Sequence, residues 1–100
     1  YINSADVISG VPSSFPGYNL TIGSSGEKVR QLQQQLNRIA ENYPAIPTLV
    51  ADGIYGPRTA EAVRVFQEIF GLPQTGVTDF ATWYAISRIY VAVSRIAEPG

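Results

Sequence analysis

Carboxylates are the residues of this chain that could do the most chemistry, because the sequence contains no histidine and no cysteine. The usual zinc ligands, the histidine general base and the cysteine nucleophile are therefore missing. Glycoside hydrolysis would need two carboxylates that face each other across a cleft. The chain has eight carboxylates: Asp6, Glu27, Glu41, Asp52, Glu61, Glu68, Asp79 and Glu98.

The spacing of these carboxylates favours structural positions over a catalytic pair. Glu27, Glu61 and Asp79 fall in the first turns of expected helices, where the helix dipole favours negative charge. Glu68 is expected on a helix surface. No pair remains that the pattern brings together, and three helices offer little room for a deep cleft. We therefore expect no enzymatic activity, no cofactor and no metal site.

Length and charge narrow the class of protein further. One hundred residues suit a single domain. A formal net charge of −1 creates no field that would attract nucleic acid. No apolar run approaches the roughly 20 residues that span a bilayer. The chain begins at Tyr1 and contains no methionine, so we interpret it as a processed piece of a longer protein.

The first of three helical patterns begins in the segment 23–27. Ser24 and Glu27 have the spacing of a capping box. The apolar face of this helix is expected to consist of Val29, Leu32, Leu36 and Ile39, at helical spacing. The opposite face is expected to carry Gln31, Gln34, Gln35 and Arg38. The helix is expected to end at residues 42–44, before a loop at 44–51.

The second helical pattern starts at Pro57, because a proline at the first helical position loses no hydrogen bond. Gly71 is the expected left-handed stop. The expected core residues are Ala62, Val63, Phe66 and Phe70. The sequence VRQLQ at 29–33 reappears as VRVFQ at 63–67, which indicates a pseudo-repeat within one domain. We expect the amides of the equivalent Gln33 and Gln67 to bond to loop backbone.

The third helix is expected to start at Asp79 with Thr78 as its cap, and to turn Phe80 and Trp83 inward. It is unusually apolar from residue 84 to 97. Its polar residues, Ser87-Arg88 and Ser94-Arg95, are seven positions apart and predict one narrow exposed stripe. We predict that an extended N-terminal arm, residues 1–19, packs on this helix. A dimer partner or a neighbouring domain would be the alternative cover.

Several of these segments, taken in order, resemble a known family. They are LTIGSSGEKVRQLQ at 20–33, DGIYGPRT at 52–59, VRVFQ at 63–67, GLPQTGVTD at 71–79 and ATW at 81–83. This order is similar to that of the small three-helix peptidoglycan-binding domains that accompany the catalytic units of bacterial cell-wall hydrolases. The resemblance covers roughly residues 20 to 86. The loop at 44–51 and the helix beyond Ile86 are longer than the family pattern.

The resemblance implies a compact all-α three-helix domain over residues 20–97, extended by the arm and the prolonged third helix. It also implies a non-catalytic module that tethers a linked domain to peptidoglycan, through stem peptide or glycan, at the extracellular wall or spore envelope of a bacterium. A protein–protein assembly module of the envelope or spore layer, with a homodimer through the third helix, is the alternative. A metalloprotease propeptide is disfavoured, since its inhibitory cysteine is missing.

Six residues are the candidates for contact with peptidoglycan: Asp52, Tyr55, Arg58, Thr59, Tyr84 and Arg88. Asp52 also suits a structural role, because its carboxylate would accept N–H bonds in a tight turn. Arg58 at a helix N-terminus suits a stem-peptide carboxylate, although a merely solvated arginine is the alternative. We interpret Tyr55 as half core and half groove. Tyr84 and Arg88 would stack on a sugar and bond to it, or simply form an exposed stripe.

Overall fold

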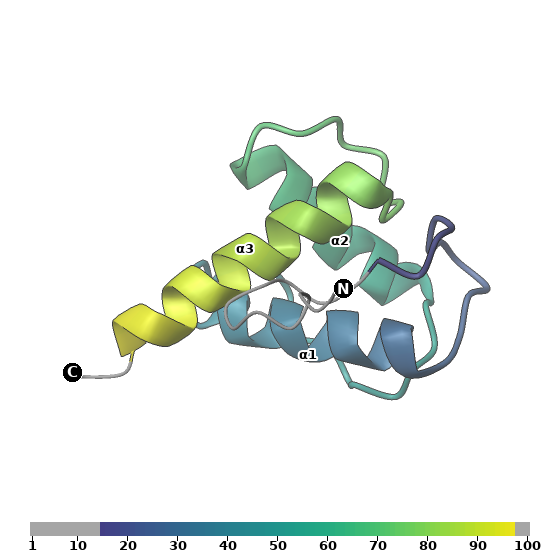
Figure 1. The fold of residues 1–100 in the computed structure, drawn as a ribbon, viewed down its shortest axis with the longest axis horizontal. Helices are drawn as coiled ribbons and strands as arrows, with labels where there is room; N and C mark the ends of the chain where they lie inside the picture. Colours follow the sequence, from purple (N-terminus) through teal and green to yellow (C-terminus); the bar gives the residue numbers. More distant parts are fainter. Residues whose placement is uncertain (1–14, 98–100) are drawn as a thin grey trace, which may run out of the picture.

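The computed structural model describes residues 15–97, with side chains described from 15 to 94. Three helices make up this region: α1 (Glu27–Ala40), α2 (Pro57–Ile69) and α3 (Phe80–Ala97). Within it only two isolated β-bridges occur and no strand, which confirms the all-α prediction. Figure 1 shows α3 crossing in front of α2 and passing above α1, with its yellow C-terminal end reaching beyond both of the other helices. None of the described helices is both long and apolar enough to span a membrane.

The core lies where the apolar faces of the three helices meet. Every residue of the predicted α1 stripe is buried, as are Ala62, Val63 and Phe66 of α2. Trp83, Tyr55 and Phe66 are the largest fully buried side chains. Phe70 is only half-buried and packs edge-on against Tyr43, at a ring-centroid distance of 5.1 Å. The helical periodicity therefore predicted most of the core correctly.

The helix starts differ from the predicted caps by one or two residues. Gly26 precedes α1 and has no side chain to cap it. The Ser24 hydroxyl instead accepts the Thr21 N–H at 3.0 Å, so the capping-box prediction is wrong. Asp79, rather than Thr78, caps α3, because its Oδ1 accepts the Thr82 N–H at 2.9 Å. The Pro57 start is confirmed, and Gly71, with φ +77°, follows α2 as predicted.

Some side chains point the opposite way from the prediction. Ser87 is 1% exposed, because it lies one helical turn after the buried Trp83 and shares its side of α3. Gln35 of α1 is also buried. Phe80 is 58% exposed and packs edge-on against Phe15 rather than into the core. In these positions helical phase decided the orientation, and residue polarity did not.

Arg38 is a further correction on the outer face of α1. Its side chain is only 20% exposed, and its Nη2 donates to the backbone oxygen of Val93 at 2.9 Å. This contact ties the end of α1 to the prolonged part of α3. Arg38, which was expected on the face of α1 opposite the core, therefore links two helices.

The segment 20–26 connects the turns that precede α2 and α3. Leu20 and Thr78 exchange two backbone hydrogen bonds, of 3.0 and 2.9 Å. A few residues later, the Tyr55 N–H donates to Ser24 O at 2.9 Å, and the Gly26 N–H donates to Gly53 O at 2.9 Å. One short extended segment thus fixes both turns in place.

The predicted N-terminal arm falls mostly outside the described residues. Residues 1–14 are not described, so the packing of residues 1–19 on α3 stays a prediction. The first described residue, Phe15, contacts the rings of Phe80 and Trp83 edge-on at 5.5 and 6.2 Å. The last part of the arm therefore lies against the N-terminal half of α3.

Candidate functional site

Gln33 of α1 fixes the turn that precedes α2. Its side chain is 1% exposed, and its Oε1 accepts the Gly53 N–H at 2.8 Å. Its Nε2 donates to the backbone oxygen of Ile54 at 2.9 Å and to the Thr59 hydroxyl at 3.1 Å. The prediction that this amide bonds to loop backbone is confirmed. One buried amide therefore holds both the turn and the first residues of α2.

Asp52 lies exposed at the corner of this turn. Its Oδ1 accepts the Ile54 N–H at 2.9 Å and the Gln33 Nε2 at 3.2 Å. These hydrogen bonds, chiefly the one from Ile54, lower the pKa of Asp52 below its ordinary value of 3.8. Asp52 is therefore a carboxylate at neutral pH. The structural reading of Asp52 as a turn residue is confirmed.

Gly53 is required by the geometry of the same turn. Its φ is +78°, a conformation that residues with a side chain rarely adopt. A Cβ added at this position would also lie 3.1 Å from the backbone oxygen of Gly26. The turn can therefore approach the start of α1 closely only with glycine here.

Tyr55 and Thr59 are buried beneath the turn. Tyr55 is 1% and Thr59 is 3% exposed. The Tyr55 hydroxyl donates to Gly76 O at 2.7 Å and contacts the Thr78 hydroxyl at 3.1 Å. The interpretation of Tyr55 as half groove is therefore wrong, because both its ring and its hydroxyl are satisfied inside the protein. Tyr55 supports the site from below.

A pocket of about 360 Å³ opens between the turn and the start of α2, and we call it the Arg58 pocket. Asp52, Arg58 and Thr59, three of the six sequence candidates, lie in its wall. The wall consists of Gln33, Leu49, Val50, Asp52, Ile54, Gly56, Pro57, Arg58 and Thr59. Asp52 and Arg58 are exposed, and aliphatic side chains make up much of the remaining wall.

The loop at 44–51 forms one wall of this pocket. Ile46 and Leu49 are buried in the core. The Asn37 amide of α1 donates to Leu49 O and accepts the Leu49 N–H, both at 2.7 Å. Arg58 Nη2 donates to Thr48 O at 3.1 Å. This loop therefore shapes the pocket, and the pocket stays open beside it.

Leu49 and Val50 are pocket residues that sequence reasoning missed. They lie in a loop without helical or strand periodicity, so no pattern marked them. The one available signal was Asn37, a polar residue on α1 within reach of the following loop.

Tyr84 and Arg88 lie apart from the Arg58 pocket. Arg88 lines a second, smaller hollow of about 280 Å³ with Phe70, Leu72, Ala85 and Ile89. Tyr84 is 43% exposed and stacks on Phe80, with ring centroids 5.4 Å apart and planes inclined by 17°. The structure therefore does not unite the six sequence candidates in one site. Three of them line the Arg58 pocket, Tyr55 is buried beneath the turn, and Tyr84 and Arg88 lie on α3.

The turn before α3 repeats the construction of the turn before α2. Gln67 of α2 accepts the Gly76 N–H at 2.9 Å. Its Nε2 donates to Val77 O at 3.1 Å and to the Thr82 hydroxyl at 3.1 Å. These partners correspond in order to those of Gln33. The predicted pseudo-repeat is therefore visible as two equivalent amide-centred turns.

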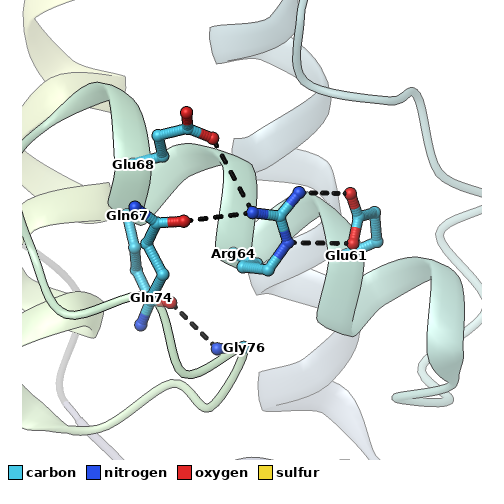
Figure 2. A network of polar contacts seen from close by, with 6 residues as sticks. All are labelled: Glu61, Arg64, Gln67, Glu68, Gln74 and Gly76. Atoms are coloured by element: carbon cyan, nitrogen blue, oxygen red, sulfur yellow. Dashed lines mark hydrogen bonds and ion pairs between the residues drawn. The ribbon is translucent and has the colours of Figure 1, made fainter.

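Figure 2 shows the surroundings of this second turn. Arg64 donates to Glu61 at 3.1 and 2.7 Å and to Gln74 at 3.1 Å, and lies 3.7 Å from Glu68. The bonds to Arg64 lower the pKa of Glu61 below its ordinary value of 4.5. The charges near the second turn are thus neutralised by one another.

The contacts at both turns suit binding better than catalysis. Glu27 pairs with Arg30 at 3.0 Å, Glu61 pairs with Arg64, and Asp79 caps α3. Among residues 15–94, no group of three or more acidic side chains gathers in a way that could hold a metal ion. The Arg58 pocket offers hydrogen bonds, two charges and aliphatic surface to a ligand.

The sequence profile of one protein family, described as "Putative peptidoglycan binding domain", matches residues 25–86. The chain belongs to this peptidoglycan-binding domain family. Both amide-centred turns and the whole Arg58 pocket lie within the matched residues. Arg88 and the prolonged end of α3 lie beyond them.

A solved structure and two characterised proteins show the same relationship. The structure of the SleB N-terminal domain superposes with a TM-score of 0.66 at 34% identity, over 77% of this chain and 99% of that one. The zinc D-Ala-D-Ala carboxypeptidase of Streptomyces albus G is 44% identical over 71 residues, 70% of this chain. The N-acetylmuramoyl-L-alanine amidase CwlA of Bacillus subtilis (strain 168) is 45% identical over 51 residues, 49% of this chain.

The matched regions are small parts of those two enzymes. They cover 26% of the carboxypeptidase and 18% of the amidase. The chain therefore corresponds to one peptidoglycan-binding domain, whereas each of these relatives is much longer.

Proposed function

We propose that this peptidoglycan-binding domain attaches a linked protein non-covalently to the bacterial cell wall, through the Arg58 pocket. The observation that carries the proposal is the position of this pocket, which lies inside the family match and bears an exposed arginine at the start of α2. The two relatives, a D-Ala-D-Ala carboxypeptidase and an N-acetylmuramoyl-L-alanine amidase, point to wall peptides as the surroundings of such domains.

The start of α2 provides a physical reason for anion binding at this pocket. Gly56, which precedes the helix, has no side chain to satisfy the first backbone N–H groups. The helix dipole adds partial positive charge at this end, and the Arg58 guanidinium adds a full charge. A carboxylate of a stem peptide would accept hydrogen bonds from both.

Attachment would act by raising local concentration. A binding module on the same chain as a second domain keeps that domain close to its substrate, so a modest affinity is sufficient. The module itself would add binding and no chemistry, since three of its carboxylates already serve Arg30, Arg64 and the start of α3. In this proposal the parent protein works outside the cell, at the wall or the spore envelope.

Replacement of Arg58 by alanine tests the location of the site. Arg58→Ala should weaken binding to purified, hydrolase-free sacculi by about tenfold, the effect of about 1.4 kcal/mol, because a charge-assisted hydrogen bond is lost. The fold should persist, since Arg58 is exposed and donates only to one loop oxygen in the described structure. Co-sedimentation with sacculi measures the affinity, and circular dichroism checks the fold.

Arg88→Ala is the matched comparison, because it removes the same charge from the hollow on α3. The proposal predicts near wild-type binding for this variant. Loss of binding in Arg88→Ala together with full binding in Arg58→Ala would move the site to α3, where Tyr84 lies. The predicted contributions of Tyr84 and Arg88 would then be the relevant ones.

A further inference from the structure

Asp52 and Thr75 occupy equivalent places in the two amide-centred turns and make equivalent contacts. Asp52 Oδ1 accepts the Ile54 N–H at 2.9 Å and the Gln33 Nε2 at 3.2 Å. Thr75 Oγ1 accepts the Val77 N–H at 3.1 Å and the Gln67 Nε2 at 3.3 Å. One oxygen atom is therefore enough to build such a turn.

The negative charge of Asp52 and its second oxygen exceed what the turn requires. The hydrogen bonds that Asp52 accepts within residues 15–94 all reach Oδ1, so Oδ2 remains available at the pocket rim. The equivalent hydroxyl of Thr75 has no such second oxygen. The turn before α2 thus carries a negative charge at Asp52, whereas the turn before α3 has the neutral Thr75 at the equivalent position.

Arg58 is a second surplus charge at the same pocket. Its equivalent at the start of α3 is Ala81, and α3 forms normally from there. The ion pairs formed within residues 15–94 involve Arg30, Arg38 and Arg64, so Arg58 and Asp52 pair neither with each other nor with another described charge. The pocket therefore contains one negative side chain, Asp52, and one positive side chain, Arg58, that do not pair with each other.

Much of the wall that these two charges share is aliphatic. Leu49, Val50, Ile54 and Pro57 contribute to it, and among the residues that the structure describes no aromatic ring lines this pocket. Such a wall suits methyl and methylene groups better than the face of a sugar. A ligand with opposite charges at its ends and short aliphatic groups between them would complement all of these features.

We propose that the Arg58 pocket binds a zwitterionic peptide segment, whose primary ammonium donates to Asp52 Oδ2 and whose carboxylate accepts from Arg58. This inference rests on the proposed function and specifies the part of the wall polymer: a stem peptide with a free diamino-acid ammonium group, rather than the glycan. Gln33 positions the carboxylate, because it occupies Oδ1 and leaves Oδ2 toward the ligand.

The isosteric variant Asp52→Asn tests this inference. Asparagine keeps the Oδ1 acceptor for Ile54 and Gln33 but removes the charge and the second acceptor. We expect about a tenfold weaker affinity for sacculi, equivalent to about 1.4 kcal/mol. Asp52→Thr, which copies the second turn, provides a second variant in case the asparagine variant fails to fold. Thr75→Asp, which adds a carboxylate to the second turn, is the control and should bind like the wild type.

Acetylation of the free amines on the sacculi tests the ligand's side of the same contact. Sacculi whose free amines have been acetylated should bind the wild type about tenfold more weakly than untreated sacculi. Asp52→Asn should bind both preparations with the same reduced affinity, because its partner charge is already gone. Acetylation of the ligand and the Asp52→Asn substitution would then each weaken binding, but together no more than either alone. Such non-additivity is expected when the ammonium and the carboxylate contact each other.

Wild-type affinity of Asp52→Asn for both kinds of sacculi would overturn the inference. Val50→Trp separates this result from failure of the proposed function, because Val50 is 78% exposed and a bulky ring there would fill the pocket. If Val50→Trp loses binding and Asp52→Asn keeps it, the pocket binds the wall but the ligand is not zwitterionic. If both keep full binding, the proposed site itself is wrong.

Discussion

At the scale of single residues, Tyr55 joins the two turns. It stands at the position in the first turn that Thr78 occupies in the second, and the two hydroxyls lie 3.1 Å apart. The Tyr55 hydroxyl also donates to Gly76 O at 2.7 Å. Burial raises the pKa of Tyr55 to about 12. The folded protein therefore favours the neutral phenol of Tyr55 over the phenolate.

This raised pKa predicts a loss of stability in alkaline solution. Below the ordinary tyrosine pKa of 10, the phenol is neutral in both the folded and the unfolded chain. As the pH rises from 10 toward 12, the unfolded chain loses the proton first, so the free energy of unfolding falls. Urea unfolding at a series of pH values measures this decline.

Tyr55→Phe should flatten the decline between pH 10 and 12. At neutral pH it should lower the free energy of unfolding by about 1–2 kcal/mol, because the Gly76 carbonyl loses a buried donor. Equal slopes for the variant and the wild type in this pH range would show that another group is responsible.

Among the elements, Gln33 and Gln67 each fix the glycine turn that leads into the next helix by accepting the glycine N–H. Gln33→Met and Gln67→Met should each lower the free energy of unfolding by about 2–4 kcal/mol, since a buried glycine N–H is left unsatisfied in each. Thermal and urea denaturation would measure both losses.

The two glutamine variants should differ in wall binding. Gln33 shapes the rim of the Arg58 pocket, whereas Gln67 serves the second turn. Measured on the folded fraction at low temperature, Gln33→Met should bind sacculi severalfold more weakly and Gln67→Met should bind like the wild type. Equal binding by both variants would mean that Gln33 has a purely structural role.

Core residues in the helices could be predicted from the sequence more completely than pocket residues in the loop. The α1 and α2 cores followed from helical spacing, and the repeated VRxxQ pattern identified both amides. Ser87 and Gln35 were misplaced, because polarity suggested exposure while helical phase placed them beside Trp83 and the α1 core. The pocket wall at Leu49 and Val50 could not be predicted, because a loop carries no periodic signal and its path is set by contacts such as those of Asn37.

At the scale of the whole molecule, the domain presents two distinct surfaces. One holds the Arg58 pocket, which lies wholly within the family match, and the other holds the hollow at Arg88, whose lining extends past the end of the match at Arg88 and Ile89. The exposed pair Phe80 and Tyr84 lies on α3. We propose that peptidoglycan binds to the first of these surfaces.

A heteronuclear NMR titration of the full 100-residue chain with soluble muropeptides tests that claim most directly. We expect the amide signals of Val50, Asp52 and Arg58 to shift as ligand is added, while those of Tyr84 and Arg88 stay in place. Shifts confined to α3 would contradict binding at the Arg58 pocket. So would the absence of shifts at muropeptide concentrations that displace the protein from sacculi.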